Sequence, residues 1–370
     1  MKKRKICCFC EKWESGGIES FLWNAFSHMD LQNFEIDILV AKQSNSIFTQ
    51  PLQDLGLHFI ELSGKQHSLA KNHQAFVQLL ALNHYDVVYI NAFHGLTFFY
   101  AWLAKRQGVP VRIIHGHNTT LRKSRTRPLK LLIHRCTRSL FSGCATQLWA
   151  CSEHAADFMF SKRTQKKLGV QVIPNGIELA RFRFDPNCRT AVRKQLDMED
   201  CVIIGNVGRL CFQKKQDFLL DVFAQVHAKR PDSRLLLVGE GEERLVLQQK
   251  VKQLGLEPFV LFCGVSSQVE KLLWAMDVFV FPSRFEGLGI AAIEAQAAGL
   301  PVLCSDCLPK ETHVTKQIKA LSLNASVQTW ADEILKLCDF PRQCGDLHQI
   351  RRAGFDINMV AKQLEQHLMG

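Results

Sequence analysis

Short apolar segments alternate with longer amphipathic segments along the whole sequence, and this alternation predicts the fold. The first series of apolar segments covers residues 6–10, 36–40, 58–62, 87–91, 111–115, 147–151 and 170–173. The second series covers residues 202–207, 235–238, 260–262, 278–281, 302–304 and 320–323. Because β-branched and aromatic residues are frequent in both series, we expect these segments to form strands. Amphipathic stretches between them, such as residues 218–228 and 243–254, are expected to form helices.

The order of these segments indicates the fold class and the domains. Strands that alternate with helices form parallel sheets with helices on both faces. Two such series within 370 residues predict an α/β protein with two Rossmann-like, doubly wound domains that face a central cleft, the expected active site. Proline and Asn-Gly residues cluster at 174–189. We therefore expect an N-terminal domain at 1–180, a C-terminal domain at 181–352, and a helix within 353–370 that packs back towards the first domain.

The composition is that of an ordinary globular protein. Hydrophobic residues make up 47% of the chain and charged residues 22%, so enough apolar surface is present to form a core and disorder is excluded. The chain contains no run of 18 apolar residues that could span a membrane. The basic residues 2–5 precede an apolar stretch, 6–10, that is too short for the core of a signal peptide. We therefore expect a cytoplasmic protein.

The cysteines and acidic residues do not form an evident metal site. Most of the 14 cysteines lie in apolar segments, where thiols behave as small buried hydrophobic groups. Two pairs have the CxxC spacing, Cys7 with Cys10 and Cys304 with Cys307. Residues three apart in a strand point to opposite faces, so the first pair cannot both bind one ion. The chain also lacks an Asp-x-Asp motif, and we expect no metal.

Positive charge is concentrated in one part of the chain. Residues 87–152 contain 10 Lys and Arg and no Asp or Glu, and they account for nearly all of the net charge of +11. Pro128 suits the first turn of a helix, and residues 129–141 have the spacing of a short basic amphipathic helix. The expected patch comprises Arg122, Lys123, Arg125, Arg127, Lys130, Arg135 and Arg138. Anionic lipid, a phosphorylated acceptor, nucleic acid or solvent alone could face such a patch.

Three loops after predicted strands carry residues suited to binding phosphate groups or sugar hydroxyls. Gly16 and Gly17 precede a helix, where backbone amides can approach an anion, although a plain turn would look the same. Arg209 and Lys214 lie between a strand and a helix, which suits a diphosphate or a surface charge pair. Residues 285–295 carry Glu286 in a glycine loop and Glu294 in an apolar helix. A carboxylate there requires a partner, such as sugar hydroxyls or neighbouring amides.

Together these segments resemble the retaining glycosyltransferases of family 4, which have the GT-B fold. The resemblance covers nearly the whole chain and rests on the order and spacing of its motifs. These motifs are Gly16-Gly17, residues 115–118, residues 173–177, Arg209 with Lys214, residues 238–241, residues 262–265, and Glu286 with Glu294. The first motif and residues 294–301 look most similar to enzymes of bacterial capsule, exopolysaccharide and O-antigen assembly.

The resemblance implies a role for each motif. The C-terminal domain would bind a nucleotide-sugar donor, with UDP expected, and the N-terminal domain a glycan acceptor. Arg209 and Lys214 would bind the diphosphate, and Glu294 the ribose hydroxyls. The remaining donor residues would be Gly16 and Gly17 at the phosphate, Gly264 and Val265 beside the base, and Glu286, Gly287, Leu288, Gly289 and Ile290 around the sugar and phosphates. His115 would lie beside the reacting sugar. Many relatives have proline near Ala291.

The expected mechanism needs no metal and no other cofactor. Breaking a glycosyl phosphate bond places negative charge on the leaving diphosphate, which fixed cations can stabilise. The resemblance implies retention of anomeric configuration, yet no carboxylate nucleophile can be chosen from the sequence. We therefore expect attack on the same face of the sugar, with the leaving phosphate taking the acceptor proton. The expected catalytic residues are His115, as an orienting group, with Arg209, Lys214 and Glu286.

The basic patch lies in the predicted acceptor domain. We therefore expect a lipid-linked glycan acceptor and a protein peripherally attached to the cytoplasmic face of the inner membrane. Two other functions stay open at this point. One is a nucleotide-sugar epimerase or phosphorylase of the same fold, and the other is a non-catalytic membrane- or nucleic-acid-binding protein on this scaffold. Salt-dependent nucleic-acid binding without binding of a UDP-sugar would favour the second.

Overall fold

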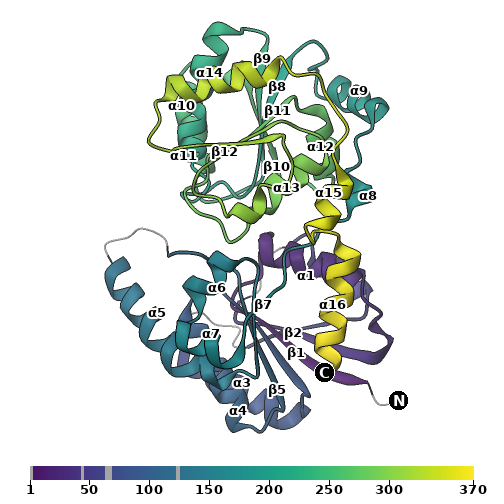
Figure 1. Cartoon of the computed structure of the whole chain (residues 1–370), viewed down its shortest axis with the longest axis vertical. Helices are drawn as coiled ribbons and strands as arrows, with labels where there is room; N and C mark the ends of the chain where they lie inside the picture. Colours follow the sequence, from purple (N-terminus) through teal and green to yellow (C-terminus); the bar gives the residue numbers. More distant parts are fainter. Residues whose placement is uncertain (1–2, 43–45, 63–68, 122–125) are drawn as a thin grey trace. The chain divides into compact units, whose positions relative to one another are not determined.

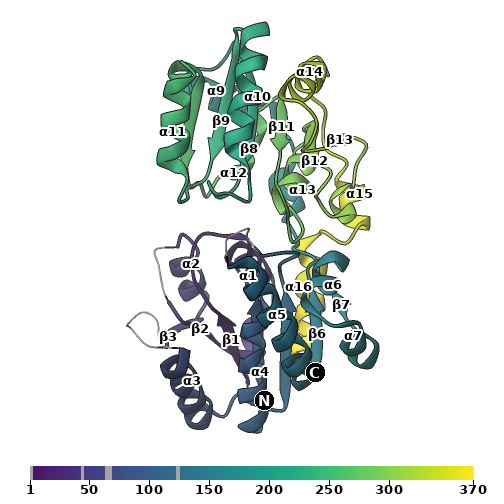
Figure 2. The ribbon, with the colours of Figure 1, turned by 90° about the vertical axis from the view of Figure 1, so that its left-hand side faces the viewer.

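The chain forms two compact units that each contain one parallel sheet (Figures 1 and 2). The computed structural model describes residues 3–42, 46–62, 69–121 and 126–370. Unit 1 comprises Met1–Gly176 and Ile357–Gly370, and unit 2 comprises Ile177–Asp356.

Unit 1 contains a seven-stranded sheet in the order β3-β2-β1-β4-β5-β6-β7. Its strands are β1 (Arg4–Cys10), β2 (Phe34–Val40), β3 (His58–Glu61), β4 (Val87–Ala92), β5 (Val111–Gly116), β6 (Gln147–Ala150) and β7 (Gln171–Val172). Its helices are α1 (Gly17–Ser27), α2 (Thr49–Asp54), α3 (Leu69–Asn83), α4 (Phe99–Arg106), α5 (Arg127–Phe141), α6 (Glu153–Met159), α7 (Lys162–Leu168) and α16 (Ile357–Met369). Short 3-10 turns are η1 (Leu31–Asn33), η2 (Gly95–Phe98) and η3 (Ser142–Cys144).

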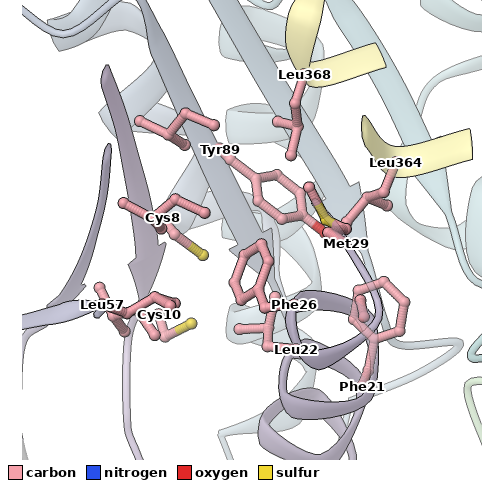
Figure 3. Close-up of a cluster of buried hydrophobic side chains, with 14 of the residues drawn as sticks. Cys8, Cys10, Phe21, Leu22, Phe26, Met29, Leu57, Tyr89, Leu364 and Leu368 are labelled. Atoms are coloured by element: carbon pink, nitrogen blue, oxygen red, sulfur yellow. The ribbon is translucent and has the colours of Figure 1, made fainter. Parts of the chain in front are cut away.

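Alternate residues of β1 face two different cores. Cys8 and Cys10 belong to the cluster formed with α1 and α16, as Figure 3 shows. Phe9 points to the other face, where its ring stacks on Tyr100 of α4 with centroids 4.1 Å apart. Because both faces are covered, most residues of β1 and β4 are buried, which is why these strands are mainly apolar after Arg4 and Lys5.

The helix α16 follows unit 2 in sequence but completes the core of unit 1. Leu364 and Leu368 are fully buried and point towards Tyr89 and Met29 (Figure 3). α16 packs against α1, whose Phe21, Leu22 and Phe26 belong to the same cluster. The core of unit 1 therefore depends on residues from both ends of the chain.

Unit 2 contains a six-stranded sheet in the order β10-β9-β8-β11-β12-β13. Its strands are β8 (Val202–Val207), β9 (Ser233–Val238), β10 (Val260–Gly264), β11 (Val278–Phe281), β12 (Val302–Ser305) and β13 (Ile318–Leu321). Its helices are α8 (Leu179–Phe182), α9 (Pro186–Gln195), α10 (Gln216–Lys229), α11 (Arg244–Gln253), α12 (Val269–Ala275), α13 (Ile290–Ala297), α14 (Val327–Cys338) and α15 (Leu347–Arg352), with the turns η4 (Glu257–Phe259) and η5 (Lys310–Thr312). Buried Trp330 of α14 joins α10 in its core.

The predicted fold class is confirmed, because the paired strands of both sheets are parallel and each sheet carries helices. Every predicted strand is present, although most have ends one or two residues away from the prediction. β1, β2 and β9 each begin two residues earlier than predicted, and β10 ends two residues later. β13 begins at Ile318 instead of residue 320, and β7 is reduced to Gln171 and Val172. Both are edge strands, whose extent is set by a single neighbouring strand. In the described part of the chain, no helix is long and apolar enough to cross a bilayer.

Candidate functional site

The candidate site of unit 2 lies where the strand order of its sheet reverses. β8 and β11 are neighbours there, and their carboxyl ends reach the same edge because the pair is parallel. The loop after β8 carries Arg209 and Lys214, and the loop after β11 carries Glu286. In open α/β sheets this position is the usual site for a ligand. The fold thus brings together two loops that are more than 70 residues apart in sequence.

Lys214 and Glu286 form an ion pair at this edge. The Lys214 ammonium lies 2.7 Å from Oε1 of Glu286, and the side chains are only 15% and 7% exposed. Gln213 donates to the other carboxylate oxygen at 3.2 Å. The ammonium also lies 4.5 Å from the centroid of the Phe281 ring. These contacts fix the position of a largely desolvated cation, which strengthens its field on any nearby anion.

Arg209 lies on the same loop but is far more exposed. Its Nε donates to Oε2 of Glu242 at 3.1 Å, and half of its side chain is accessible. The backbone carbonyl of Arg209 accepts from Nε2 of the buried Gln216 at 3.0 Å. The backbone of this loop packs closely against Gly239. A Cβ on Gly239 would lie only 2.2 Å from the Gly208 carbonyl oxygen. The backbone of Arg209 is therefore well fixed, while its guanidinium can reach solvent.

The glycine loop before α13 ends in a left-handed residue. Gly289 is the N-cap of α13 and has φ +85°, a conformation that favours glycine. A Cβ at this position would also contact Phe281 at 3.4 Å and Leu308 at 3.5 Å. Gly289 has no side chain that could cap the helix, so the first amides of Ile290 and its neighbours suit an anion. Leu288 is anchored from behind by the Thr312 hydroxyl, which donates to its carbonyl.

Glu294 lies in α13 among buried small residues. Burial raises the pKa of its carboxyl to about 7, while the nearby positive charges of Arg181 and Lys214 oppose this rise and Glu270 adds to it. Arg181 of α8 pairs with Glu270 of α12 at 2.7 Å. No sequence motif marks Arg181 or Glu270 as site residues. Only the folded arrangement of α8, α12 and α13 shows that they surround Glu294.

Gly264 and Val265 lie at the end of β10, two strands away from β8. Gly264 has φ +70°, and its carbonyl accepts from the Gly239 amide at 2.8 Å. Val265 is 43% exposed. Both residues therefore lie at the same carboxyl edge of the sheet as the other predicted donor residues of unit 2.

In unit 1, Gly16 and Gly17 form the start of α1. Gly16 is the N-cap, and its amide donates to Oε2 of Glu19 at 3.2 Å, while the Glu14 amide donates to Oε1 at 2.9 Å. Burial raises the pKa of Glu19 to about 7, against the hydrogen bonds from the backbone. A Cβ on Gly17 would meet no atom within 4 Å. Gly17 therefore has open space beside its backbone.

His115 is more deeply buried than the sequence suggested. The side chain has no exposed surface, and Nδ1 is 2.8 Å from the Tyr89 hydroxyl. Burial, with His117 as a further cause, holds the pKa of His115 well below its usual value. In unit 1 as described, His115 cannot touch a ligand directly. The ring of His117 lies beside it in a tilted arrangement, with centroids 4.0 Å apart. His117 is partly exposed, and its Nε2 contacts Asn91 Oδ1 at 3.0 Å.

The structure describes only part of the predicted basic patch. Arg122, Lys123 and Arg125 lie outside the described residues. Arg138 turns inward, where its guanidinium donates to the carbonyls of Asp157 and Phe158 at the end of α6. Arg127 is also partly buried and donates to Thr120 at 3.2 Å. Lys130 and Arg135 are exposed, so they carry the outer charge of the described part of α5.

Among the described residues, no group of three or more His, Cys, Asp or Glu side chains is arranged to bind a metal ion. Cys8 and Cys10 share one face of β1 and Cys7 lies outside that cluster. Cys304 is buried and its sulfur lies 3.9 Å from His313 Nε2, while Cys307 is exposed. The described cysteines thus act as packing residues or surface thiols.

Comparison with known proteins identifies the family. Residues 15–181 match the family model described as Glycosyltransferase Family 4, and residues 201–339 match the model described as Glycosyl transferases group 1. The glycosyltransferase EpsF of Bacillus subtilis strain 168 is 30% identical over 332 residues, which cover 87% of this chain and 84% of the relative. UDP-Gal:alpha-D-GlcNAc-diphosphoundecaprenol alpha-1,3-galactosyltransferase of Escherichia coli is 24% identical over 338 residues, covering 87% and 86%.

Solved structures show the same fold. HepE of Anabaena, in complex with UDP and glucose, matches with a TM-score of 0.81 over 99% of this chain and 100% of that chain, at 19% identity. WaaG, a glycosyltransferase involved in lipopolysaccharide biosynthesis, matches with a TM-score of 0.72 over 99% and 100%, at 17% identity. Two Rossmann-like sheets with loops at their reversal points define a protein of the GT-B fold. The chain belongs to glycosyltransferase family 4, whose members are retaining enzymes that transfer sugars from nucleotide-sugars.

Proposed function

We propose that this glycosyltransferase uses a UDP-sugar, binds it on unit 2, and transfers the sugar to a lipid-linked glycan during assembly of a bacterial surface polysaccharide. The E. coli relative is named for transfer from UDP-Gal to a sugar on diphosphoundecaprenol. HepE has been solved with UDP-glucose. These relatives support a uridine donor and a lipid diphosphate acceptor, and the exposed cations of α5 suit such an acceptor.

The observation that carries the donor assignment is the buried Lys214–Glu286 pair at the reversal point of the unit 2 sheet. In the proposed site, Lys214 and Arg209 face the leaving diphosphate, and the amides at the start of α13 add to their field. Glu286 orients Lys214 and accepts hydrogen bonds from hydroxyl groups of the donor sugar. Glu294 accepts from the ribose hydroxyls. Since fixed cations neutralise the leaving group, no metal is needed.

In unit 1, we propose that His117 contacts the reacting sugar and that buried His115 positions it. The Tyr89 hydroxyl supports His115 through a 2.8 Å contact with Nδ1. Because burial keeps both imidazoles neutral, they orient groups by hydrogen bonding and do not supply a positive charge. Gly17 remains a candidate for close approach of a ligand phosphate.

Replacing Lys214 tests the donor assignment. Loss of one cation at the leaving diphosphate should lower turnover about a hundredfold or more, by comparison with loss of an oxyanion-hole donor. We expect this for Lys214→Ala and Arg209→Ala, measured as UDP release from UDP-sugars in buffer containing EDTA. Because Lys214→Ala leaves Glu286 buried without its cation, Lys214→Met combined with Glu286→Gln provides a second variant in which no unpaired charge remains.

Lys229→Ala is the matched control for these variants. Lys229 of α10 also pairs with a carboxylate, Asp332, at 2.7 Å, but both side chains are nearly half exposed and distant from the loops of the site. We expect its turnover to equal that of the wild type. Folded Lys214 variants with near-normal turnover, or loss of all activity in EDTA, would refute the proposed metal-free role of this cation.

We also propose that the outer face of α5 lies on an anionic membrane surface. Leu129, Leu132 and Leu140 are 58%, 58% and 69% exposed and recur at spacings that share one helix face. Cations flank this apolar stripe, an arrangement typical of helices that lie in a lipid surface. Such a large exposed stripe is costly for a helix that faces only water.

Vesicle binding tests this surface. Leu129→Ser with Leu132→Ser should weaken binding to vesicles containing anionic phospholipid at least about tenfold, because each leucine gains about 1.5 kcal/mol or more on entering lipid. Thermal stability should be unchanged, since both side chains are already exposed. Leu245→Ser with Val246→Ser removes two equally exposed residues from α11 and should leave binding intact. If both double variants bound vesicles equally well, or if binding did not depend on salt concentration, α5 would not be the membrane-binding surface.

A further inference from the structure

A carboxylate and an imidazole meet at the point where the strand order of the unit 1 sheet reverses. Glu11 follows β1 and His94 follows β4, and these strands are neighbours. Oε2 of Glu11 lies 3.1 Å from Nε2 of His94, and the side chains are 38% and 30% exposed. Although partial burial opposes it, the contact with His94 holds the pKa of Glu11 below its usual value. An ionised acceptor beside an imidazole thus faces solvent at the edge where such sheets bind ligands.

Two exposed apolar side chains flank this pair, beside Lys12 and Thr97, which also interact with the Glu11 carboxylate. Phe93 and Leu96, on either side of His94, are 39% and 43% exposed. The carboxylate repels phosphate but accepts hydrogen bonds from hydroxyl groups, and an exposed aromatic ring can pack on the C–H face of a sugar. This combination suits a neutral, polyhydroxylated ring better than a phosphate.

The same segment is anchored to the basic helix α5. The Gly95 amide donates to Nδ1 of His134 at 2.8 Å, and Nε2 of His134 therefore carries the proton and donates to the Phe158 carbonyl at 3.0 Å. A Cβ on Gly95 would lie 2.4 Å from Oγ1 of Thr137, so η2 and α5 are in direct contact. His94 is consequently attached to the helix that carries Lys130 and Arg135. A ligand with both a sugar and a diphosphate can use both features.

We propose that Glu11, His94 and Phe93 form the binding subsite for the terminal sugar of the acceptor, while the exposed cations of α5 bind the acceptor diphosphate. This assignment rests on the proposed function, because it presumes a lipid diphosphate that carries a sugar. Glu11 accepts from sugar hydroxyls, His94 orients Glu11 and contacts the ring oxygens, and Phe93 packs on the ring. The subsite selects the acceptor sugar and takes no part in donor binding.

Binding of two matched probes tests the subsite without any donor. The probes are farnesyl diphosphate alone and farnesyl diphosphate linked to N-acetylglucosamine, galactose or glucose, measured by titration calorimetry. For the preferred sugar, the wild type should bind the linked form about tenfold more tightly than farnesyl diphosphate, as expected for one or two net hydrogen bonds. Glu11→Gln, His94→Gln and Phe93→Ser should each reduce this ratio to about twofold or less.

Two controls separate the sugar from the diphosphate. Lys130→Gln with Arg135→Gln should weaken both probes and leave the ratio unchanged. His58→Gln removes another imidazole that contacts a carboxylate, Asp37 at 3.3 Å, on β3 of the same unit, and should change neither probe. Thermal midpoints report whether each variant is folded, and three separate variants keep the test valid if one is not.

The outcomes distinguish this inference from the proposed function. Equal affinity of the wild type for farnesyl diphosphate and for every sugar-linked probe would overturn the subsite. The subsite would also be wrong if all three folded variants kept the affinity ratio of the wild type. UDP-sugar turnover is measured separately on the wild type. The wild type could fail to turn over any UDP-sugar and still bind the sugar-linked probe more tightly in a way that requires Glu11 and His94. That result would refute the proposed reaction but would support the glycan-binding subsite.

Discussion

Glu294 illustrates how far a residue can depart from its behaviour in water. Its helix consists largely of buried alanines, and burial raises the pKa of its carboxyl to about 7, against the opposing charges of Arg181 and Lys214. The folded pKa thus exceeds the ordinary value of 4.5. Losing the proton is therefore harder in the folded chain than in the unfolded chain.

The pH dependence of UDP binding should report this carboxyl. Ribose hydroxyls donate to the ionised form, so we expect UDP affinity to rise as pH increases through about 7 and to level off above it. Glu294→Gln should remove this dependence between pH 6 and 8.5, as measured by titration calorimetry. If wild type and variant showed the same pH profile, Glu294 would not contact the nucleotide.

The stability of Glu294→Gln provides an independent check. Because the native pKa is raised, the wild type loses stability as pH rises from about 4.5 to about 7, and the loss is complete above that range. Removing the charge should therefore make the variant more stable than the wild type at pH 8, with little difference at pH 5. Glu19 has a similarly raised pKa and is unchanged in both proteins.

Individual site residues were predictable only in part. The spacing of Arg209, Lys214, Glu286 and Glu294 identified them as candidates, and the structure places Lys214 against Glu286. The depth of His115 was not predictable, since an apolar strand does not reveal which of its end residues remains covered. Arg181 and Glu270 were missed because they approach Glu294 only through the packing of three separate helices.

At the scale of elements, the start of α1 is built around one buried carboxylate. Glu19 accepts from two backbone amides, which replaces the side-chain cap that Gly16 lacks. This arrangement leaves Gly17 with no steric neighbour on its open side. A stable helix start can therefore coexist with a backbone that is accessible to a ligand.

Substitution of Gly17 distinguishes the two roles of this turn. Gly17→Ala should keep or slightly raise stability, by about 0.5 kcal/mol, since nothing lies within 4 Å of the new methyl group. If a phosphate approaches this backbone, sugar transfer should fall about a hundredfold, because small displacements of a reacting group are costly. Gly143→Ala, at an exposed glycine with equal space, is the control. Normal transfer by Gly17→Ala would exclude close approach there.

Element boundaries matched the prediction fully in two central strands of unit 2, whereas β1, β2 and β9, which also lie between two neighbours, begin two residues before their predicted starts. β8 and β11 begin and end at the predicted residues, because apolar strands buried on both faces form distinct segments. β13 and β7 lie at the edges of their sheets, and their limits depend on pairing that the local sequence does not specify. The helix α5 was predicted, but not that Arg138 would turn inward to the end of α6.

At the scale of the whole molecule, the two cores share no residues, so we expect each unit to have its own free energy of unfolding. The cluster around α1 and α16 belongs to unit 1, and the cluster around α10 and α14 belongs to unit 2. A ligand that binds one unit stabilises that unit through mass action, by about 2.7 kcal/mol at a hundredfold excess over its dissociation constant.

Calorimetric unfolding should separate the units. We expect UDP to raise the midpoint of the unit 2 transition, with GDP having less effect. Leu364→Ala should lower the free energy of unfolding of unit 1 by about 2–5 kcal/mol, because the substitution leaves a cavity in its core. Ile334→Ala, which truncates a buried residue of unit 2, should instead destabilise unit 2 and leave the unit 1 transition unchanged. A single transition shifted by both substitutions would contradict independent cores.

The return of α16 to unit 1 has a consequence for how the chain is made. A ribosome synthesises unit 2 entirely before it reaches Ile357, so all six strands of the second sheet can assemble while the first core still lacks its closing helix. During that interval Phe26 and Tyr89 lack the cover of Leu364 and Leu368. The newly made first half should then be a preferred client of chaperones, which would release it once α16 docks.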